Sequence, residues 1–148
     1  EIYTLSLHDA LPISIVPPDM STDGRPLVAR SLAAVAVLHT GLGLVVGRDT
    51  IRAAISEGLV GTWAAPAERR AAYWFLVTGA SLMVLSTAVA ELEKRDPALP
   101  LPVIGGLAAL TAAGVATMPA SGFWTLTAPL AIAVVRRRRA RRPGQSAG

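Results

Sequence analysis

The sequence contains no cysteine, and this absence removes a whole class of chemistry. Without thiols the chain forms no disulfide, and it offers neither a thiolate nucleophile nor the ligands of zinc-thiolate and iron–sulfur sites. Charged residues are also scarce, at 16% of the 148 residues, whereas 52% are hydrophobic. This composition is too apolar for a water-soluble domain of such length and favours a small membrane protein built as one domain.

The first thirteen residues, EIYTLSLHDALPI, match codon by codon the translation of a widely used sequencing-library adapter. We therefore expect residues 1–14 to be an artefact fused in frame, residues 15–26 to be a disordered N-terminal segment, and Met20 to be the natural start. Without Glu1 and Asp9 the acidic residues fall from 10 to 8 against 14 basic ones, so the formal net charge rises from +4 to +6. His8 is lost as well, which leaves His39 as the single histidine.

Four apolar blocks fill most of the remaining chain, at residues 31–47, 71–90, 102–118 and 123–135. As a helix the first block would be ~26 Å long, close to the ~30 Å thickness of the hydrocarbon core of a bilayer. A cleaved signal peptide is the weaker interpretation of this block, because Arg48 follows it and no small-x-small cleavage site does. The blocks predict an all-α protein, a four-transmembrane-helix bundle over residues 27–135.

The longest connection carries two helix signals. Ile51, Ile55 and Leu59 recur every four residues, and this spacing predicts a short amphipathic helix in the membrane interface between the first two spans. Pro66 followed by Glu68 predicts the start of the second spanning helix. The charged and aromatic residues around them are interpreted as solvated charges with an interfacial anchor, in preference to a binding vestibule.

The later connections are short. Residues 91–100, ELEKRDPALP, predict a loop whose two prolines end one helix and restart another, and residues 118–122 predict a tight turn. Pro129 predicts a kink in the fourth span, because proline removes a backbone hydrogen bond within a helix. Residues 136–148 are predicted to form a basic, disordered cytoplasmic tail.

Basic residues indicate the orientation. Four spans would place ten of them on one side, including Lys94, Arg95 and the six arginines between Arg136 and Arg142, and four on the other. The positive-inside rule then places both termini in the cytoplasm of a multi-pass protein of the bacterial inner membrane. We expect a run of four arginines to bind anionic lipid headgroups rather than nucleic acid: Arg136, Arg137, Arg138 and Arg139.

His39 is the candidate functional residue, because it lies near the middle of the first block, where an ionisable group is costly and often functional. His39, Gly43 and Gly47 are spaced by four and therefore share one helix face, so the imidazole should point into the bundle. The favoured interpretation is a neutral imidazole bonded to a hydroxyl, and a proton-relay or ligand role is the alternative. The candidate hydroxyl partners lie in the second and third blocks, and the sequence does not choose among them: Thr78, Ser81, Thr111 and Thr117.

Small residues predict where helices approach closely. Besides Gly43 and Gly47, the second block contains Ala72, Gly79 and Ser86 at intervals of seven, and the third contains Gly105, Ala109 and Ala113 at intervals of four. These faces suit packing within the bundle or between copies, and the pattern leaves both open. One histidine excludes a haem with two histidine ligands and supplies too few ligands for a metal site. A haem held by one histidine stays open but has no further support in the sequence, so we expect no metal and no cofactor.

Several short segments resemble an uncharacterised family of small bacterial four-helix membrane proteins, described only as a domain of unknown function. They are His39-Thr40-Gly41-Leu42-Gly43, Glu57-Gly58, Tyr73-Trp74-Phe75 and Met118-Pro119-Ala120-Ser121-Gly122-Phe123-Trp124. The resemblance covers residues 27–135 and implies the four-helix architecture, with no activity and no catalytic residues.

The expected function is that of a non-enzymatic integral membrane protein. Its partners would be the lipid bilayer and either a second copy or another membrane protein, for which it would be a partner or assembly subunit. The alternative is a small solute or proton-coupled transporter that uses His39. Such a transporter would differ from small four-helix multidrug transporters, which rely on a membrane-embedded glutamate. A membrane enzyme is the least favoured class, because no acid–base pair lies within a span.

Overall fold

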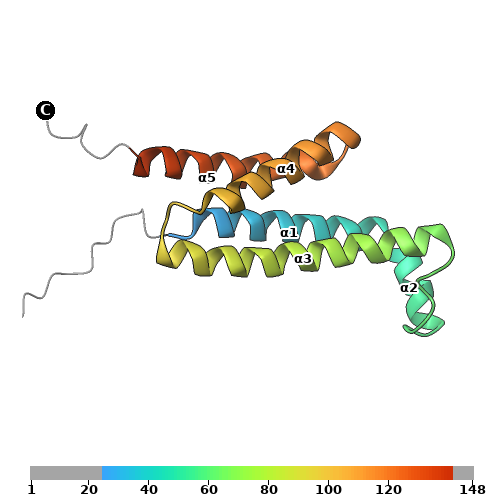
Figure 1. The fold of residues 1–148 in the computed structure, drawn as a ribbon. Helices are drawn as coiled ribbons and strands as arrows, with labels where there is room; N and C mark the ends of the chain where they lie inside the picture. Colours follow the sequence, from blue (N-terminus) through green and yellow to red (C-terminus); the bar gives the residue numbers. More distant parts are fainter. Residues whose placement is uncertain (1–24, 142–148) are drawn as a thin grey trace, which may run out of the picture.

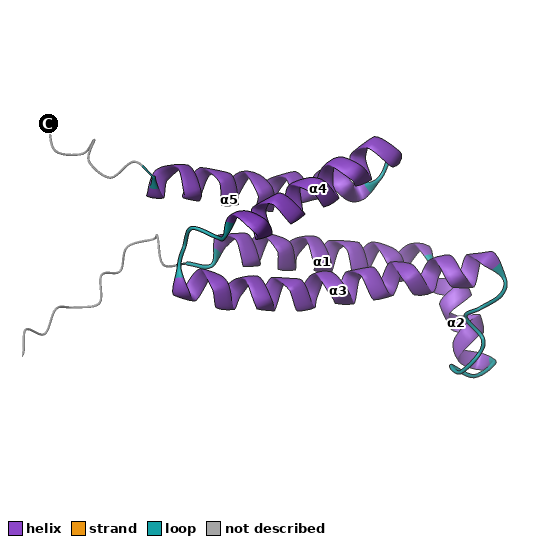
Figure 2. Ribbon diagram, viewed as in Figure 1, coloured by secondary structure: helices purple, strands orange, loops and turns teal. Residues whose placement is uncertain are grey.

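The structure, a computed structural model, describes residues 25–141 as a set of helices and connections (Figures 1 and 2). No strand occurs among these residues, which confirms the predicted all-α class. Residues 1–24 and 142–148 lie outside the described part, and with them the predictions made for residues 1–14 and for most of 15–26. The elements are α1 (Leu27–Val46), α2 (Arg48–Ser56), α3 (Ala67–Arg95), α4 (Leu101–Thr117), the 3-10 helix η3 (Gly122–Leu126) and α5 (Thr127–Ala140).

The helices form two layers. α1 and α3 make the largest helix–helix contact as an antiparallel pair, and α5 packs on α1 (Figure 1). α4 packs chiefly on α5 and η3. The start of α1 and the end of α5 lie at one end of the molecule, here called the terminal end, and α2 projects from the opposite end, here called the α2 end (Figure 1).

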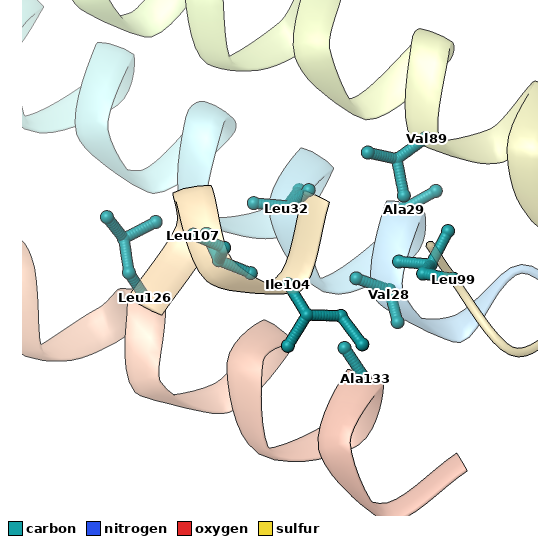
Figure 3. Packing of buried hydrophobic residues seen from close by; sticks show 9 residues of the cluster. All are labelled: Val28, Ala29, Leu32, Val89, Leu99, Ile104, Leu107, Leu126 and Ala133. Carbon is teal, nitrogen blue, oxygen red and sulfur yellow. The ribbon is translucent and has the colours of Figure 1, made fainter. Parts of the chain in front are cut away.

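The hydrophobic core lies toward the terminal end, where side chains from both layers meet (Figure 3). Outside this cluster, large apolar side chains of α1 and α3 remain exposed, with Val45 at 71% and Val84 at 68%. The core therefore uses only part of the apolar surface of the helices. Its buried members are Val28, Ala29, Leu32, Val89, Leu99, Ile104, Leu107, Leu126 and Ala133.

Two of the described helices, α1 and α3, are long and apolar enough to cross a bilayer. α4 is apolar but has 17 residues, and α5 has 14 residues. By length and composition, residues 25–141 thus contain two candidate spans and one shorter apolar helix, where the sequence predicts four spans.

The connection between the first two long helices follows its sequence signals. The predicted short helix is α2, with Asp49 in its first turn, and it ends before Leu59. Pro66 precedes α3, and Glu68 lies in the first turn of that helix, where an acidic side chain stabilises the positive end of the helix dipole. The predicted helix start is therefore confirmed.

The loop predicted at residues 91–100 is wrong in its first half, because α3 continues to Arg95. Lys94 and Arg95 lie in the last turn, where cations stabilise the negative end of the helix dipole. The loop is reduced to residues 96–100, and Pro100 precedes α4.

The fourth block also differs from its prediction. Phe123 lies in η3, and α5 begins at Thr127 and continues to Ala140. Pro129 therefore occupies the first turn of α5, where a backbone N–H has no partner within the helix. The predicted mid-span kink is wrong for this reason, and residues 136–140, predicted as disordered, are helical.

Candidate functional site

His39 packs against an aromatic ring of the neighbouring helix. Its imidazole stacks on Phe75 of α3, with ring centroids 3.9 Å apart and an angle of 4° between the planes. Gly43, one turn further along α1, faces the same ring, since a Cβ at Gly43 would lie 2.5 Å from Cδ1 of Phe75. The missing side chain of Gly43 therefore provides the space that the stacked pair occupies. Within α1, which spans Leu27–Val46, His39 lies near the middle and is displaced slightly toward the α2 end.

The hydroxyls considered as partners of His39 bond elsewhere. Thr78, Ser81, Thr111 and Thr117 each donate to a backbone carbonyl of their own helix, at 2.7 to 2.8 Å. Nε2 of His39 is buried and has no hydrogen-bond partner among residues 25–141. The interpretation of a histidine held by an interhelical hydroxyl is therefore wrong for this structure, and stacking on Phe75 is what positions the ring.

A cleft of about 580 Å³ opens beside His39, here called the His39 cleft. α1 contributes Leu38 and Leu42, α3 contributes Trp74 and Thr78, and residues from the 118–126 segment complete the wall. Its lining, drawn from residues 25–141, includes no Asp, Glu, Lys or Arg. A cleft of this size and character suits a neutral, largely apolar molecule better than an ion.

The segment that closes the cleft is held by local contacts. Phe123 packs directly against Gly114 of α4, where a Cβ would collide with the ring. Ser121 accepts a hydrogen bond from the backbone N–H of Phe123, and the indole of Trp124 donates to the carbonyl of Pro119 at 2.8 Å. This turn fixes the position of the aromatic residues between α4 and α5.

The predicted packing glycines fall into two groups. Gly43 and Gly79 lie at close contacts with the partner helix, and the side chain of Thr40 in α1 occupies the space in which Gly79 would carry a Cβ. A Cβ at Gly47 would meet Ala72 of α3 only at an ordinary distance of 3.6 Å, and its close neighbour is the carbonyl oxygen of Gly43 in the same helix. Gly105 has nothing within 4 Å of its Cβ position, and Ala109 and Ala113 are exposed. The small-residue face of α4 therefore packs on nothing within residues 25–141, and the buried face of α4 is made by Ile104, Leu107, Thr111 and Gly114.

A buried ion pair at the terminal end was missed by the sequence interpretation. The side chain of Glu93 in α3 is 1% exposed, and its Oε1 accepts a hydrogen bond from Nη1 of Arg136 at 2.7 Å. The same carboxylate accepts from the backbone N–H groups of Val28, at 3.1 Å, and Ala29, at 2.8 Å. One acidic side chain thus joins the start of α1, the end of α3 and the end of α5.

A sequence signal for Glu93 existed. Ala72, Gly79 and Ser86 follow each other at intervals of seven, and the next position in this series is Glu93. Gly79, Ser86 and Glu93 are all among the buried residues of α3. The polar run ELEKR stands close to two prolines and therefore indicates a loop. This signal hides the seven-residue spacing that places Glu93 on the inward face of the helix.

The arginine run is divided between internal and exposed positions. Arg136 pairs with Glu93, and Arg137 donates from Nη1 to the carbonyl of Leu99 at 2.8 Å. Arg138 and Arg139 are exposed. The prediction of four lipid-binding arginines therefore needs correction at Arg136, whose side chain is 11% exposed and bonded within the protein.

A partly exposed ion pair orders the connection at the α2 end. Arg69 in α3 donates two hydrogen bonds of 2.6 Å to the carboxylate of Glu57, just after α2. These bonds lower the pKa of Glu57. The pair holds the end of α2 against the first turn of α3, so the charges of Glu57 and Arg69 have a structural role in this connection.

Residues 25–141 hold no group of three or more His, Asp or Glu side chains that could bind a metal ion. Residues 25–141 define an all-α protein with two long apolar helices and a cleft that is lined by a histidine and by no charged side chain. The chain belongs to a family of unknown function, DUF6463, whose model matches residues 23–140, and this confirms the resemblance to an uncharacterised family. No curated protein and no solved structure matches the chain.

Proposed function

We propose that this protein is a polytopic integral membrane protein of the bacterial inner membrane. The observation that carries the proposal is the exposure of its apolar helices: only 33% of the most apolar stretch of α1 and 17% of that of α3 are buried. The core helix of a water-soluble protein would be mostly buried, and apolar patches of this extent are rare on soluble monomers. A bilayer would cover this surface.

In this arrangement α1, α3, α4 and α5 would cross the membrane, and α2 would lie in the interface. α5 is short, but its exposed arginines Arg138 and Arg139 can extend to the headgroups while their aliphatic stems remain in the apolar region. Glu93 and Arg136 neutralise each other at the terminal end, which reduces the cost of placing them beside lipid.

We expect a non-enzymatic role as a membrane partner or assembly subunit. The outward face of α4 presents Gly105, Ala109 and Ala113, and small residues allow the backbone of a second helix to approach closely. Either a second copy or a different membrane protein would fit this face.

Membrane integration and assembly can be tested on the same preparation. Extraction at high pH should leave the protein in the membrane pellet, and release into the supernatant would overturn the proposal. In mild detergent, Ala109→Leu should lower the assembled fraction measured by native mass spectrometry. Val84→Leu, at an exposed position on α3, is the matched control and should not change it.

The His39 cleft favours a second candidate, a small solute or proton-coupled transporter, because it places a histidine in an uncharged cavity of about 580 Å³. In proteoliposomes containing a pH-sensitive dye, His39→Ala should abolish proton flux. Thr78→Val should retain it, because the Thr78 hydroxyl bonds only to the carbonyl of Trp74. Absence of flux with the unmodified protein would eliminate the proton-coupled form of this candidate.

A further inference from the structure

A second cavity, of about 270 Å³, lies between α4 and the α1–α3 pair, and is here called the α4 groove. α3 contributes Leu85 and Val89 to its wall, and α4 contributes Pro102, Gly106 and Leu110. Leu85 and Leu110 are 38% and 45% exposed, so the groove opens to the surroundings between α3 and α4. This opening would face lipid if the protein crosses the membrane as proposed above.

The shape and lining of the α4 groove suit a hydrocarbon chain. Between Pro102 and Leu110 it follows α4 over ~12 Å at the helical rise of 1.5 Å per residue. Every side chain that lines it is apolar. A polar ligand would lose its hydrogen bonds to water there without replacement, whereas an acyl chain loses none.

The groove has a cationic end. Ala133 of α5 lines it, and Arg137 lies four residues later, on the same helix face. Nη1 of Arg137 donates to the carbonyl of Leu99, another lining residue, and Nε of Arg137 is buried without a hydrogen-bond partner among residues 25–141. The guanidinium of Arg137 thus places a permanent positive charge at this end of the groove, and guanidinium groups pair well with phosphate or carboxylate oxygens.

We propose that the α4 groove binds one anionic phospholipid, with an acyl chain along α4 and the phosphate at Arg137. The proposal rests on the membrane location proposed above. It differs from a general attraction between basic residues and a bilayer, because it requires one lipid held at one place by two adjacent features, an apolar wall and a charge at its end.

Native mass spectrometry in mild detergent tests this site with phosphatidylglycerol and phosphatidylcholine in equal amounts. The expected result is one phosphatidylglycerol retained per chain, in preference to phosphatidylcholine. Gly106→Leu should remove this adduct by filling the groove, and Gly105→Leu should retain it. A Cβ at either glycine meets nothing within 4 Å, but only Gly106 lines the groove, so the two variants are a matched pair.

The charge at the groove end is tested separately. Arg137→Gln should lower phosphatidylglycerol binding about fivefold, since a basic residue near a headgroup contributes about that factor. Arg139→Gln, exposed in the same run, should have a clearly smaller effect. Equal retention of both lipids, or equal loss in Gly106→Leu and Gly105→Leu, would overturn the lipid site while leaving the membrane proposal intact. Release of the protein by high-pH extraction would instead overturn the membrane proposal.

Discussion

Glu93 compensates for a helix start that has no cap of its own. Pro26, which precedes α1, makes no side-chain cap, and the first turn of α1 has no acidic residue. The N–H groups of this turn need acceptors, and its positive dipole favours a negative charge. Glu93 supplies both from a position 65 residues away from Val28, and Arg136 neutralises the remaining charge.

Glu93→Ala should therefore destabilise the protein strongly. The substitution leaves a buried guanidinium without its carboxylate, and loss of one partner of a buried pair typically costs about 3–5 kcal/mol of unfolding free energy. Reversible unfolding of the detergent-solubilised protein, followed by circular dichroism, measures the change.

Glu91→Ala is the control for this experiment. Glu91 lies in the same part of α3, but its ion pair with Lys94 is exposed, with side chains at 65% and 64% exposure. Exposed pairs contribute about 0–1 kcal/mol. Equal destabilisation by Glu91→Ala and Glu93→Ala would contradict the role given to Glu93.

At this scale the sequence predicted some contacts and missed others for physical reasons. The shared face of His39 and Gly43 follows from helical spacing and is present in the structure. Phe75 as the stacking partner was not predictable, because the register between two helices depends on how their side chains interlock. Glu93 was missed because a polar run beside prolines was assigned to a loop, although charged residues can end a helix with one side chain turned inward.

The contact between α1 and α3 depends on two glycines that receive side chains from the partner helix. Phe75 of α3 fills the space at Gly43, and Thr40 of α1 fills the space at Gly79. Because the two glycines lie on different helices, each helix inserts one side chain beside a glycine of the other. This reciprocal arrangement sets how closely α1 and α3 approach.

Gly43→Ala and Gly79→Ala should each lower the unfolding free energy by about 1–3 kcal/mol, the usual range for an overpacked contact. Gly105→Ala is the matched control, because its Cβ would meet nothing within 4 Å. It should be neutral or slightly stabilising, since alanine favours a helix more than glycine does. Thermal unfolding in one detergent compares the three variants, and an equal loss in Gly105→Ala would argue against glycine-specific packing.

The connection from α2 to α3 should respond to acid. The Arg69 hydrogen bonds lower the pKa of Glu57, so the ionised form is favoured in the folded state. A group with a lowered pKa contributes stability above its unfolded pKa, and loses that contribution as the pH falls through its folded pKa. Amide exchange of residues 57–66 should therefore quicken, relative to the rest of the chain, once the pH falls below about 4, the region in which glutamate titrates.

Glu57→Gln should remove this acid response and give a connection whose relative exchange rate stays constant over the same range. Glu68→Gln changes a nearby carboxylate that lies in the first turn of α3. It should leave the acid response in place. An unchanged profile in Glu57→Gln would show that the ion pair with Arg69 does not order this segment.

The boundaries of the helices show where signals in the sequence are sufficient to predict a helix start or end. Pro66 and Pro100 mark helix starts correctly, because proline lacks the N–H that an α-helix uses beyond its first turn. Pro129 was misread as an interior residue, since the sequence does not reveal that η3 precedes α5. The length of the apolar block does not predict the end of α5 either. The helix continues through four arginines, because cationic side chains are favourable near the negative end of a helix dipole.

At the scale of the whole molecule, charge and apolar surface are segregated along one axis. The terminal end carries Arg25, Arg30, Lys94 and Arg95 together with the arginines of α5, and the α2 end carries Arg48, Arg52, Arg69 and Arg70. Exposed apolar side chains lie between them on α1 and α3, Val84 among them. If the protein crosses the membrane as proposed, the positive-inside rule would place the terminal end in the cytoplasm.

The absence of native cysteine makes this orientation directly measurable, because one introduced thiol is then the only reactive one. A membrane-impermeant maleimide should label Ser56→Cys at the α2 end in intact spheroplasts, and Ala140→Cys at the terminal end only after the membrane is opened. Both positions are exposed. The reverse order of labelling would invert the orientation.

Val84→Cys tests whether α3 is surrounded by a bilayer or by water. Val84 is 68% exposed in the isolated chain, so a thiol there would react readily if α3 faced water. A bilayer around α3 excludes both the charged reagent and the thiolate form that reacts with it, because each loses its hydration in hydrocarbon. Val84→Cys should therefore remain unlabelled in opened membranes and become labelled after denaturation in detergent, whereas labelling at the rate of Ser56→Cys would place α3 in water.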